Sequence, residues 1–167
     1  RTSPGNPDRK PAQLQTMNAL VSGGADLVPS PLSIENVARS AKAAARIRSA
    51  RAALLDCRLC AHECGVNRLE SPAGRCHAGQ YARVFQAQVE VSDELLLTPT
   101  LAIALSGCDL RCSFCITGRE SWNPQAGQLA DIRELASAAE RALANGARSI
   151  MILGGEPTIH LPTVLEL

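Results

Sequence analysis

The segment Gly107-Cys108-Asp109-Leu110-Arg111-Cys112-Ser113-Phe114-Cys115 places three cysteines at the spacing CxxxCxxC. It directly follows the apolar run 101–105, which predicts a buried strand that ends in a polar, glycine-led loop. Three thiolates on one short loop can hold three irons of a cubane cluster, whereas a [4Fe–4S] cluster usually takes four cysteines. The fourth iron would then keep an open position for a small chelating molecule. A disulfide, buried apolar cysteines and a zinc site with a fourth ligand are the alternatives for this spacing.

A second motif follows about forty residues later, where the apolar run 149–153 ends in Gly154-Gly155-Glu156-Pro157-Thr158. Between the two motifs, residues 131–145 predict a helix that Gly146 ends. Its apolar stripe consists of Ile132, Leu135, Ala136, Ala139 and Leu143. We expect the strand 101–106, this helix and the strand 149–153 to form one right-handed β-α-β unit with parallel strands. Both motifs would then lie at the carboxyl ends of neighbouring strands.

This order of strand, cysteine loop, helix, strand and Gly-Gly-Glu resembles the radical S-adenosylmethionine (SAM) superfamily. The resemblance implies an α/β fold, the N-terminal part of a partial TIM-like barrel. It implies one electron that cleaves SAM to methionine and a 5′-deoxyadenosyl radical, which takes a hydrogen atom from the substrate. The implied ligands of a [4Fe–4S] cluster are Cys108, Cys112 and Cys115. The implied SAM contacts are Phe114 against adenine, and Gly154, Gly155 and Glu156 at the amino group.

Four further cysteines precede the strand, at Cys57, Cys60, Cys64 and Cys76. Four thiolates on two short knuckles suit tetrahedral zinc or a second iron–sulfur cluster, and we expect them to converge on one metal, with zinc slightly preferred. His62 or His77 could replace one thiolate, although four cysteines already complete a site. A redox-active dithiol is the main alternative for Cys57 and Cys60.

The cysteine blocks and the sequence Gly-Gly-Glu-Pro-Thr-Ile-His-Leu-Pro resemble more narrowly the uncharacterised proteins similar to pyruvate formate-lyase activating enzyme. This group often has Pro-Arg where Ala61-His62 stand and Gln-Asn where Ile116-Thr117 stand, which puts the substrate in doubt. The implied partners are a glycyl-radical protein or another protein substrate, and an electron donor such as flavodoxin or ferredoxin. A radical SAM methyltransferase, a peptide-modifying enzyme and a non-catalytic zinc-ribbon module are the alternatives.

Composition places these motifs in an ordinary globular chain. Of the 167 residues, 46% are hydrophobic and 20% are charged, and the net charge of +1 gives no argument for nucleic acid or a membrane surface. Clustered cysteines favour metal binding in a reducing, cytoplasmic setting over disulfides. We expect a disordered tail or linker at 1–32, a basic helix at 33–56 with Ser33 as its N-cap, the cysteine module at 57–80 and a truncated core at 81–167. The isolated 167 residues are therefore expected to be inactive alone.

Overall fold

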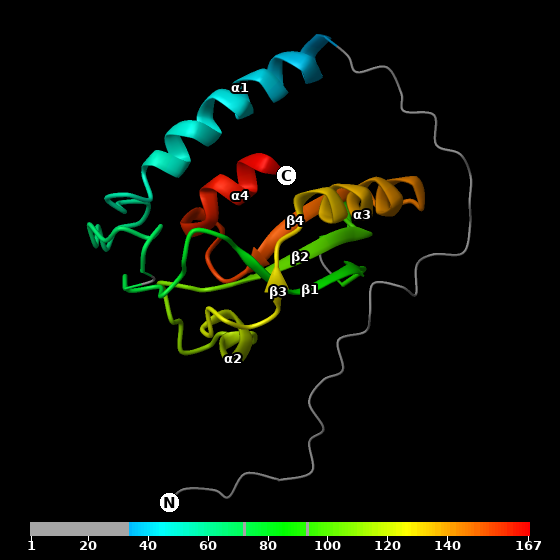
Figure 1. Cartoon of the computed structure of the whole chain (residues 1–167). Coiled ribbons are helices and arrows are strands. Elements are labelled where there is room, and N and C mark those ends of the chain that lie inside the picture. Colours follow the sequence, from blue (N-terminus) through cyan, green and yellow to red (C-terminus); the bar gives the residue numbers. More distant parts are fainter. Residues whose placement is uncertain (1–33, 72, 93) are drawn as a thin grey trace, which may run out of the picture. The chain divides into compact units, whose positions relative to one another are not determined.

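The computed structural model describes residues 34–71, 73–92 and 94–167 (Figure 1). The expected tail at 1–32 and the expected N-cap Ser33 lie outside these residues. The helices are α1 (Ile34–Ala52), α2 (Gly118–Ser121), α3 (Ile132–Ala144), the 3-10 helix η2 (Pro157–His160) and α4 (Leu161–Glu166). The strands are β1 (Arg83–Glu90), β2 (Thr100–Ser106), β3 (Gln128–Leu129) and β4 (Ser149–Gly154).

The sheet has the strand order β3-β1-β2-β4. Strands β2 and β4 pair in parallel, from Thr100 opposite Ser149 to Leu105 opposite Gly154, so the predicted β-α-β unit is confirmed. Strand β1 pairs antiparallel with both β2 and β3. The described residues therefore form one mixed four-stranded sheet, and the expected barrel is not confirmed.

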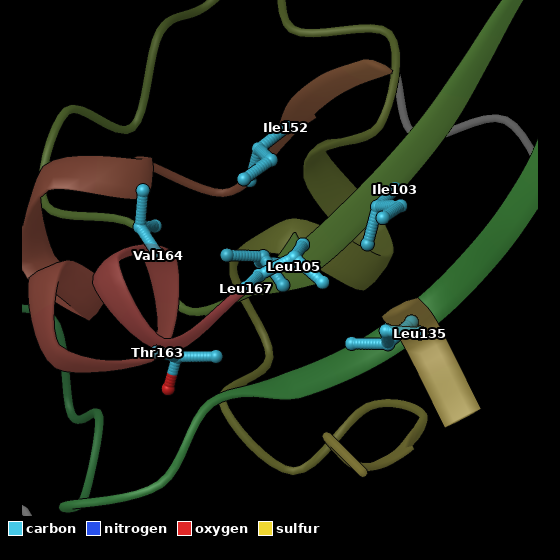
Figure 2. A pocket seen from close by; sticks show the side chains of 7 residues that line it. All are labelled: Ile103, Leu105, Leu135, Ile152, Thr163, Val164 and Leu167. Atoms are coloured by element: carbon cyan, nitrogen blue, oxygen red, sulfur yellow. The ribbon is translucent and has the colours of Figure 1, made fainter. Parts of the chain in front are cut away.

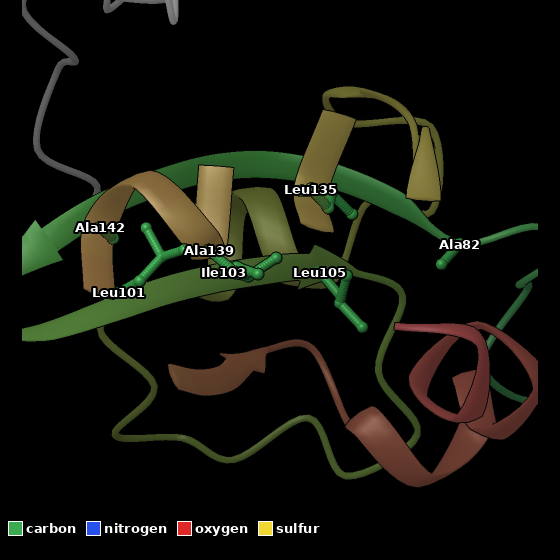
Figure 3. Close-up of a cluster of buried hydrophobic side chains, with 7 residues drawn as sticks. All are labelled: Ala82, Leu101, Ile103, Leu105, Leu135, Ala139 and Ala142. Atoms are coloured by element: carbon green, nitrogen blue, oxygen red, sulfur yellow. The ribbon is translucent and has the colours of Figure 1, made fainter. Parts of the chain in front are cut away.

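Helix α3 covers one face of this sheet, as its amphipathic pattern predicts. Asp131 caps the helix by accepting hydrogen bonds from the main-chain N–H groups of Arg133 and Glu134. Figure 3 shows the apolar cluster that results, in which the α3 side chains face those of β2. The cluster consists of Ala82, Leu101, Ile103, Leu105, Leu135, Ala139 and Ala142.

One residue of the predicted α3 stripe lies elsewhere, because Leu143 is 46% exposed and Ala142 is buried in its place. At about 100° per residue, position 142 falls about 20° from Leu135 around the helix, whereas position 143 falls about 80° away. The stripe that faces the sheet therefore runs through Leu135, Ala139 and Ala142.

Helix α1 packs against α4 at its C-terminal end, where the guanidinium of Arg51 pairs with the carboxylate of Glu166. Ala50 and Leu54 are buried at the same end, while most of the described α1 side chains are exposed. Residues 31–167 belong to one compact unit, so α1, the cysteine-rich segment and the sheet are parts of a single body. Within the described part of the chain, no helix has the length and apolarity needed to cross a membrane.

Figure 2 shows a small apolar hollow between β2, β4, α3 and α4. It is lined by Ile103, Leu105, Leu135, Ile152, Thr163, Val164 and Leu167. Its volume of about 10 Å³ leaves room for about one water molecule, so it cannot hold an organic ligand.

Candidate functional site

The two motifs predicted from the sequence meet through their main chains at the carboxyl ends of β2 and β4. The N–H of Gly155 donates to the carbonyl of Leu105 at 2.6 Å, and the N–H of Glu156 donates to the carbonyl of Gly107 at 3.1 Å. A Cβ added to Gly155 would lie 1.9 Å from the Gly107 oxygen, and Gly154 has a φ of +94°. Only glycine permits this approach, so the Gly-Gly pair holds the cysteine loop directly against β4.

The cysteine loop runs from Gly107 to α2. Cys108 is buried, whereas Cys112 and Cys115 are half-buried. The N–H of Cys115 donates to the Cys112 carbonyl at 3.1 Å and forms a tight turn. Arg111 adopts the left-handed conformation at φ 54°, and its guanidinium carbon lies 5.8 Å from the centroid of the Trp122 ring. This cation–π contact ties the loop to the chain that follows α2.

Cys115 lies beside two hydroxyl groups. Its sulfur is 3.6 Å from Thr117 Oγ1 and 3.8 Å from Ser121 Oγ. The Thr117 hydroxyl lowers the pKa of the Cys115 thiol below its ordinary value; burial opposes this, and the Thr117 main chain and Ser121 add to it. The sulfur of Cys115 is thus in a setting that favours a thiolate.

The predicted SAM-binding side chains lie on either side of this junction. Phe114 is 84% exposed at the surface of the loop. Glu156 caps η2, where its Oε1 accepts hydrogen bonds from the Thr158 N–H at 3.0 Å and the Thr158 hydroxyl at 2.8 Å. The cap fixes the position of the Glu156 carboxylate immediately after Gly155.

Contacts link parts of the first cysteine block. Cys60 packs against the buried cluster of Cys76, Ala78 and Ile159, and the N–H of Arg75 donates to Cys64 Sγ at 3.4 Å. Cys57 is buried, and a guanidinium nitrogen of Arg68 donates to its sulfur at 3.8 Å. Burial raises the pKa of the Cys60 thiol, the nearby His62 main chain lowers it, and Asp109 raises it.

The first cysteine block contacts the later cysteine loop through Asp109. Asp109 is buried, and its Oδ1 has no hydrogen-bond partner among the described residues. Its main-chain carbonyl lies 3.3 Å from His62 Nε2, and its Oδ2 lies 4.0 Å from the same nitrogen. The His62 ring thus connects the first cysteine block with the later cysteine loop.

Two buried polar side chains at this junction, Arg68 and His160, are not among the predicted site residues. Arg68 is 3% exposed and donates to the carbonyls of Ala78 at 2.9 Å, Ile159 at 2.7 Å and Gly79 at 2.7 Å. His160 is also 3% exposed, and its Nε2 donates to the Ser106 carbonyl at 2.8 Å. The signal in the sequence is their position: Arg68 lies four residues after Cys64, and His160 lies four residues after Glu156.

The residues present fit an iron–sulfur cluster and SAM by donor type and by position. Three thiols occupy one loop at the end of β2, and the Gly-Gly junction leaves no side chain between that loop and Glu156. Among the described residues, no three His, Cys, Asp or Glu side chains are grouped tightly enough to hold a metal ion. The ligand assignments in both cysteine blocks therefore remain predictions.

Comparison with known proteins finds similarity in the region that contains the two motifs. Residues 103–167 match the model of the radical SAM superfamily. The chain is 38% identical over 65 residues to 7-carboxy-7-deazaguanine synthase of Methanothermobacter thermautotrophicus, covering 39% of this chain and 26% of that protein. It is 41% identical over 58 residues to the synthase of the same name from Prochlorococcus marinus, covering 35% and 25% of the two chains.

An uncharacterized protein of Methanocaldococcus jannaschii is 25% identical over 133 residues, which cover 72% of this chain and 37% of that protein. No solved structure matches the chain. The chain spans about a quarter of the length of the synthases. Members of the matched superfamily use a [4Fe–4S] cluster and SAM, and the match covers residues 103–167 of this chain.

Proposed function

We propose that this chain belongs to an enzyme that cleaves SAM reductively. The observation that supports the proposal most strongly is the main-chain junction between the cysteine loop and Gly154-Gly155-Glu156 at the ends of two parallel strands. Ligands bind at the carboxyl ends of parallel strands in α/β folds. When bound, the cluster supplies the electron that cleaves SAM to methionine and a 5′-deoxyadenosyl radical.

The residues of the chain bind and orient the two cofactors in this proposal. Cys108, Cys112 and Cys115 provide the thiolates. The Gly154 and Gly155 main chain provides a surface without side chains for close approach, and the Glu156 carboxylate accepts a hydrogen bond from the SAM ammonium group. Phe114, exposed in the structure, is placed at the loop surface where it can cover the adenine ring.

Anaerobic reconstitution tests the cluster assignment. We expect a brown protein with roughly three to four irons bound by the later cysteines. Replacing Cys108, Cys112 and Cys115 together with alanine should remove the visible absorbance. The matched control replaces Cys57, Cys60 and Cys64, which should leave that absorbance in place. The opposite result would assign the cluster to the first block.

Binding of SAM can be measured separately from its cleavage. Addition of SAM should change the electron paramagnetic resonance spectrum of the dithionite-reduced cluster, and Glu156→Ala should weaken that change. Asp131→Ala, which removes the cap of α3 and lies outside both motifs, serves as the control. An unaltered spectrum with SAM present would contradict the proposed SAM site.

Two candidates exist for the reaction that follows cleavage. Resemblance of the motifs to pyruvate formate-lyase activating enzyme favours formation of a glycyl radical on a protein partner. Similarity to proteins named 7-carboxy-7-deazaguanine synthase favours a reaction on a small molecule of that type. Assays for 5′-deoxyadenosine in the presence of each kind of substrate, with dithionite in place of flavodoxin or ferredoxin, distinguish them.

We also propose a second metal site at Cys57, Cys60, Cys64 and Cys76. The packing of Cys60 against the cluster that contains Cys76 and the N–H···S hydrogen bond to Cys64 support it, since such hydrogen bonds accompany thiolate ligands. Elemental analysis of the protein with the later three cysteines replaced should show about one zinc, or additional iron, that Cys64→Ser reduces. Protein free of metal would refute this site.

A further inference from the structure

Thr117 makes a contact with Cys115 that the motifs do not explain. Its hydroxyl oxygen lies 3.6 Å from the Cys115 sulfur, within the range of an O–H···S hydrogen bond. Thr117 thus presents a hydroxyl group to one predicted cluster ligand.

The number of hydroxyl protons decides which neighbouring hydroxyl group can donate a hydrogen bond to Cys115. Ser121 has one hydroxyl proton, and it is used at 2.8 Å on the Thr117 carbonyl. The Thr117 hydroxyl donates to Ser121 Oγ at 3.4 Å, a longer contact than the 2.8 Å hydrogen bond made by Ser121. When Cys115 is a thiolate it has no proton to donate, and the Thr117 hydroxyl can then donate to its sulfur instead.

Apart from its 3.4 Å contact with Ser121 Oγ, the Thr117 hydroxyl does not stabilise the start of α2. Thr117 occupies the N-cap position of α2, but its side chain forms no capping hydrogen bond. Ser121, by contrast, is fully buried, and its carbonyl accepts the N–H of Gly107 at 2.8 Å. Removal of the Thr117 hydroxyl should therefore change the surroundings of the sulfur without loss of a cap.

We propose that Thr117 is a positioning residue that raises the reduction potential of the cluster by donating a hydroxyl hydrogen bond to Cys115. This inference rests on the proposed function. Reduction adds one electron and no proton to the cluster, so its thiolate ligands become more negative and the reduced state gains more from a donor than the oxidised state. An external low-potential reductant, dithionite in the assay, supplies the electron.

The test is a potentiometric titration of the reconstituted chain, followed by electron paramagnetic resonance. Thr117→Val keeps the shape of the side chain and removes the donor. We expect Thr117→Val to shift the equilibrium between oxidised and reduced cluster about tenfold toward the oxidised form. For a one-electron couple, this shift corresponds to a reduction potential lower by ~59 mV. Thr117→Ser keeps the hydroxyl and should retain the wild-type potential. Ser121→Ala removes a hydroxyl whose proton is used elsewhere, and should shift the potential much less.

Each outcome bears on one of the two proposals. A cluster in every variant, with a lowered potential only in Thr117→Val, supports the inference. Equal potentials in Thr117→Val and the wild type would overturn it and leave the cluster assignment intact, as would a shift of the same size in Ser121→Ala. Absence of a cluster from the wild type would overturn the proposed function and this inference with it.

Discussion

Acidification should destabilise the fold through His160, which is the most deeply buried histidine of the three in the chain. Its pKa is lowered from 6.5 to about 4: burial is the main cause, the nearby Arg68 charge also lowers the pKa, and the hydrogen bond to the Ser106 carbonyl opposes both. The ring is therefore neutral in the folded protein and protonates more readily in the unfolded chain.

The sign of the effect follows from proton binding. Between the folded pKa of about 4 and the unfolded value of 6.5, the unfolded state binds more protons, so stability falls as the pH falls. The contribution is fully present above pH 6.5. At about 1.36 kcal/mol per pKa unit, the full difference is about 3 kcal/mol, of which about 2 kcal/mol should be lost by pH 5.

Urea denaturation followed by circular dichroism at several values of pH between 7.5 and 5 measures this loss. His160→Gln keeps an N–H donor for the Ser106 carbonyl but cannot titrate, so its stability should change by about 2 kcal/mol less than that of the wild type over this range. His62 and His77 are exposed and present in both proteins, so their effects cancel. The same pH dependence in both proteins would refute the reasoning, as would a His160 pKa near 6.5 in a direct nuclear magnetic resonance titration of the wild type.

Two substitutions test the junction described above. Gly155→Ala would place a methyl group 1.9 Å from the Gly107 oxygen, so we expect thermal denaturation to show a free energy of unfolding lower by about 3 kcal/mol. Gly79→Ala is the control, because the space around Gly79 is open, and it should be nearly neutral. Equal losses in the two variants would contradict the close approach. Arg68→Met leaves three carbonyls without their donor and should cost about 3 kcal/mol in urea denaturation, while Arg75→Met at an exposed position should change stability by less than about 0.5 kcal/mol. A neutral Arg68→Met would show that the buried guanidinium is not needed.

The sequence predicted the parallel pair and the helix between its strands because each has a local signal. The apolar runs predict β2 and β4, and the helical period with Asp131 at its start predicts α3. The position of β1 has no such signal, since residues 81–97 alternate only loosely. Its antiparallel pairing depends on how the chain turns between Glu90 and Thr100, and a local pattern does not encode that direction.

In the candidate site, too, some residues have a local signal in the sequence and others do not. Its cysteines and glycines are visible in the sequence because their spacing is unusual. Arg68 looks like an ordinary surface residue, and it is buried only because carbonyls of Ala78, Gly79 and Ile159 meet around it, the last of them 91 positions away. In the sequence, Thr117 is only a departure from a related group, because its contact with the Cys115 sulfur depends on how the chain turns into α2.

The joint between Gly107 and Gly155 is made of main-chain atoms, which all residue types share. Exchanges among the side chains around it can therefore alter what the surface of the domain recognises without altering the spacing of the two segments. A chain built in this way can change its substrate by point substitution while the part that would start the reaction keeps its geometry. Choice of substrate and initiation of the chemistry are, in this architecture, separately adjustable.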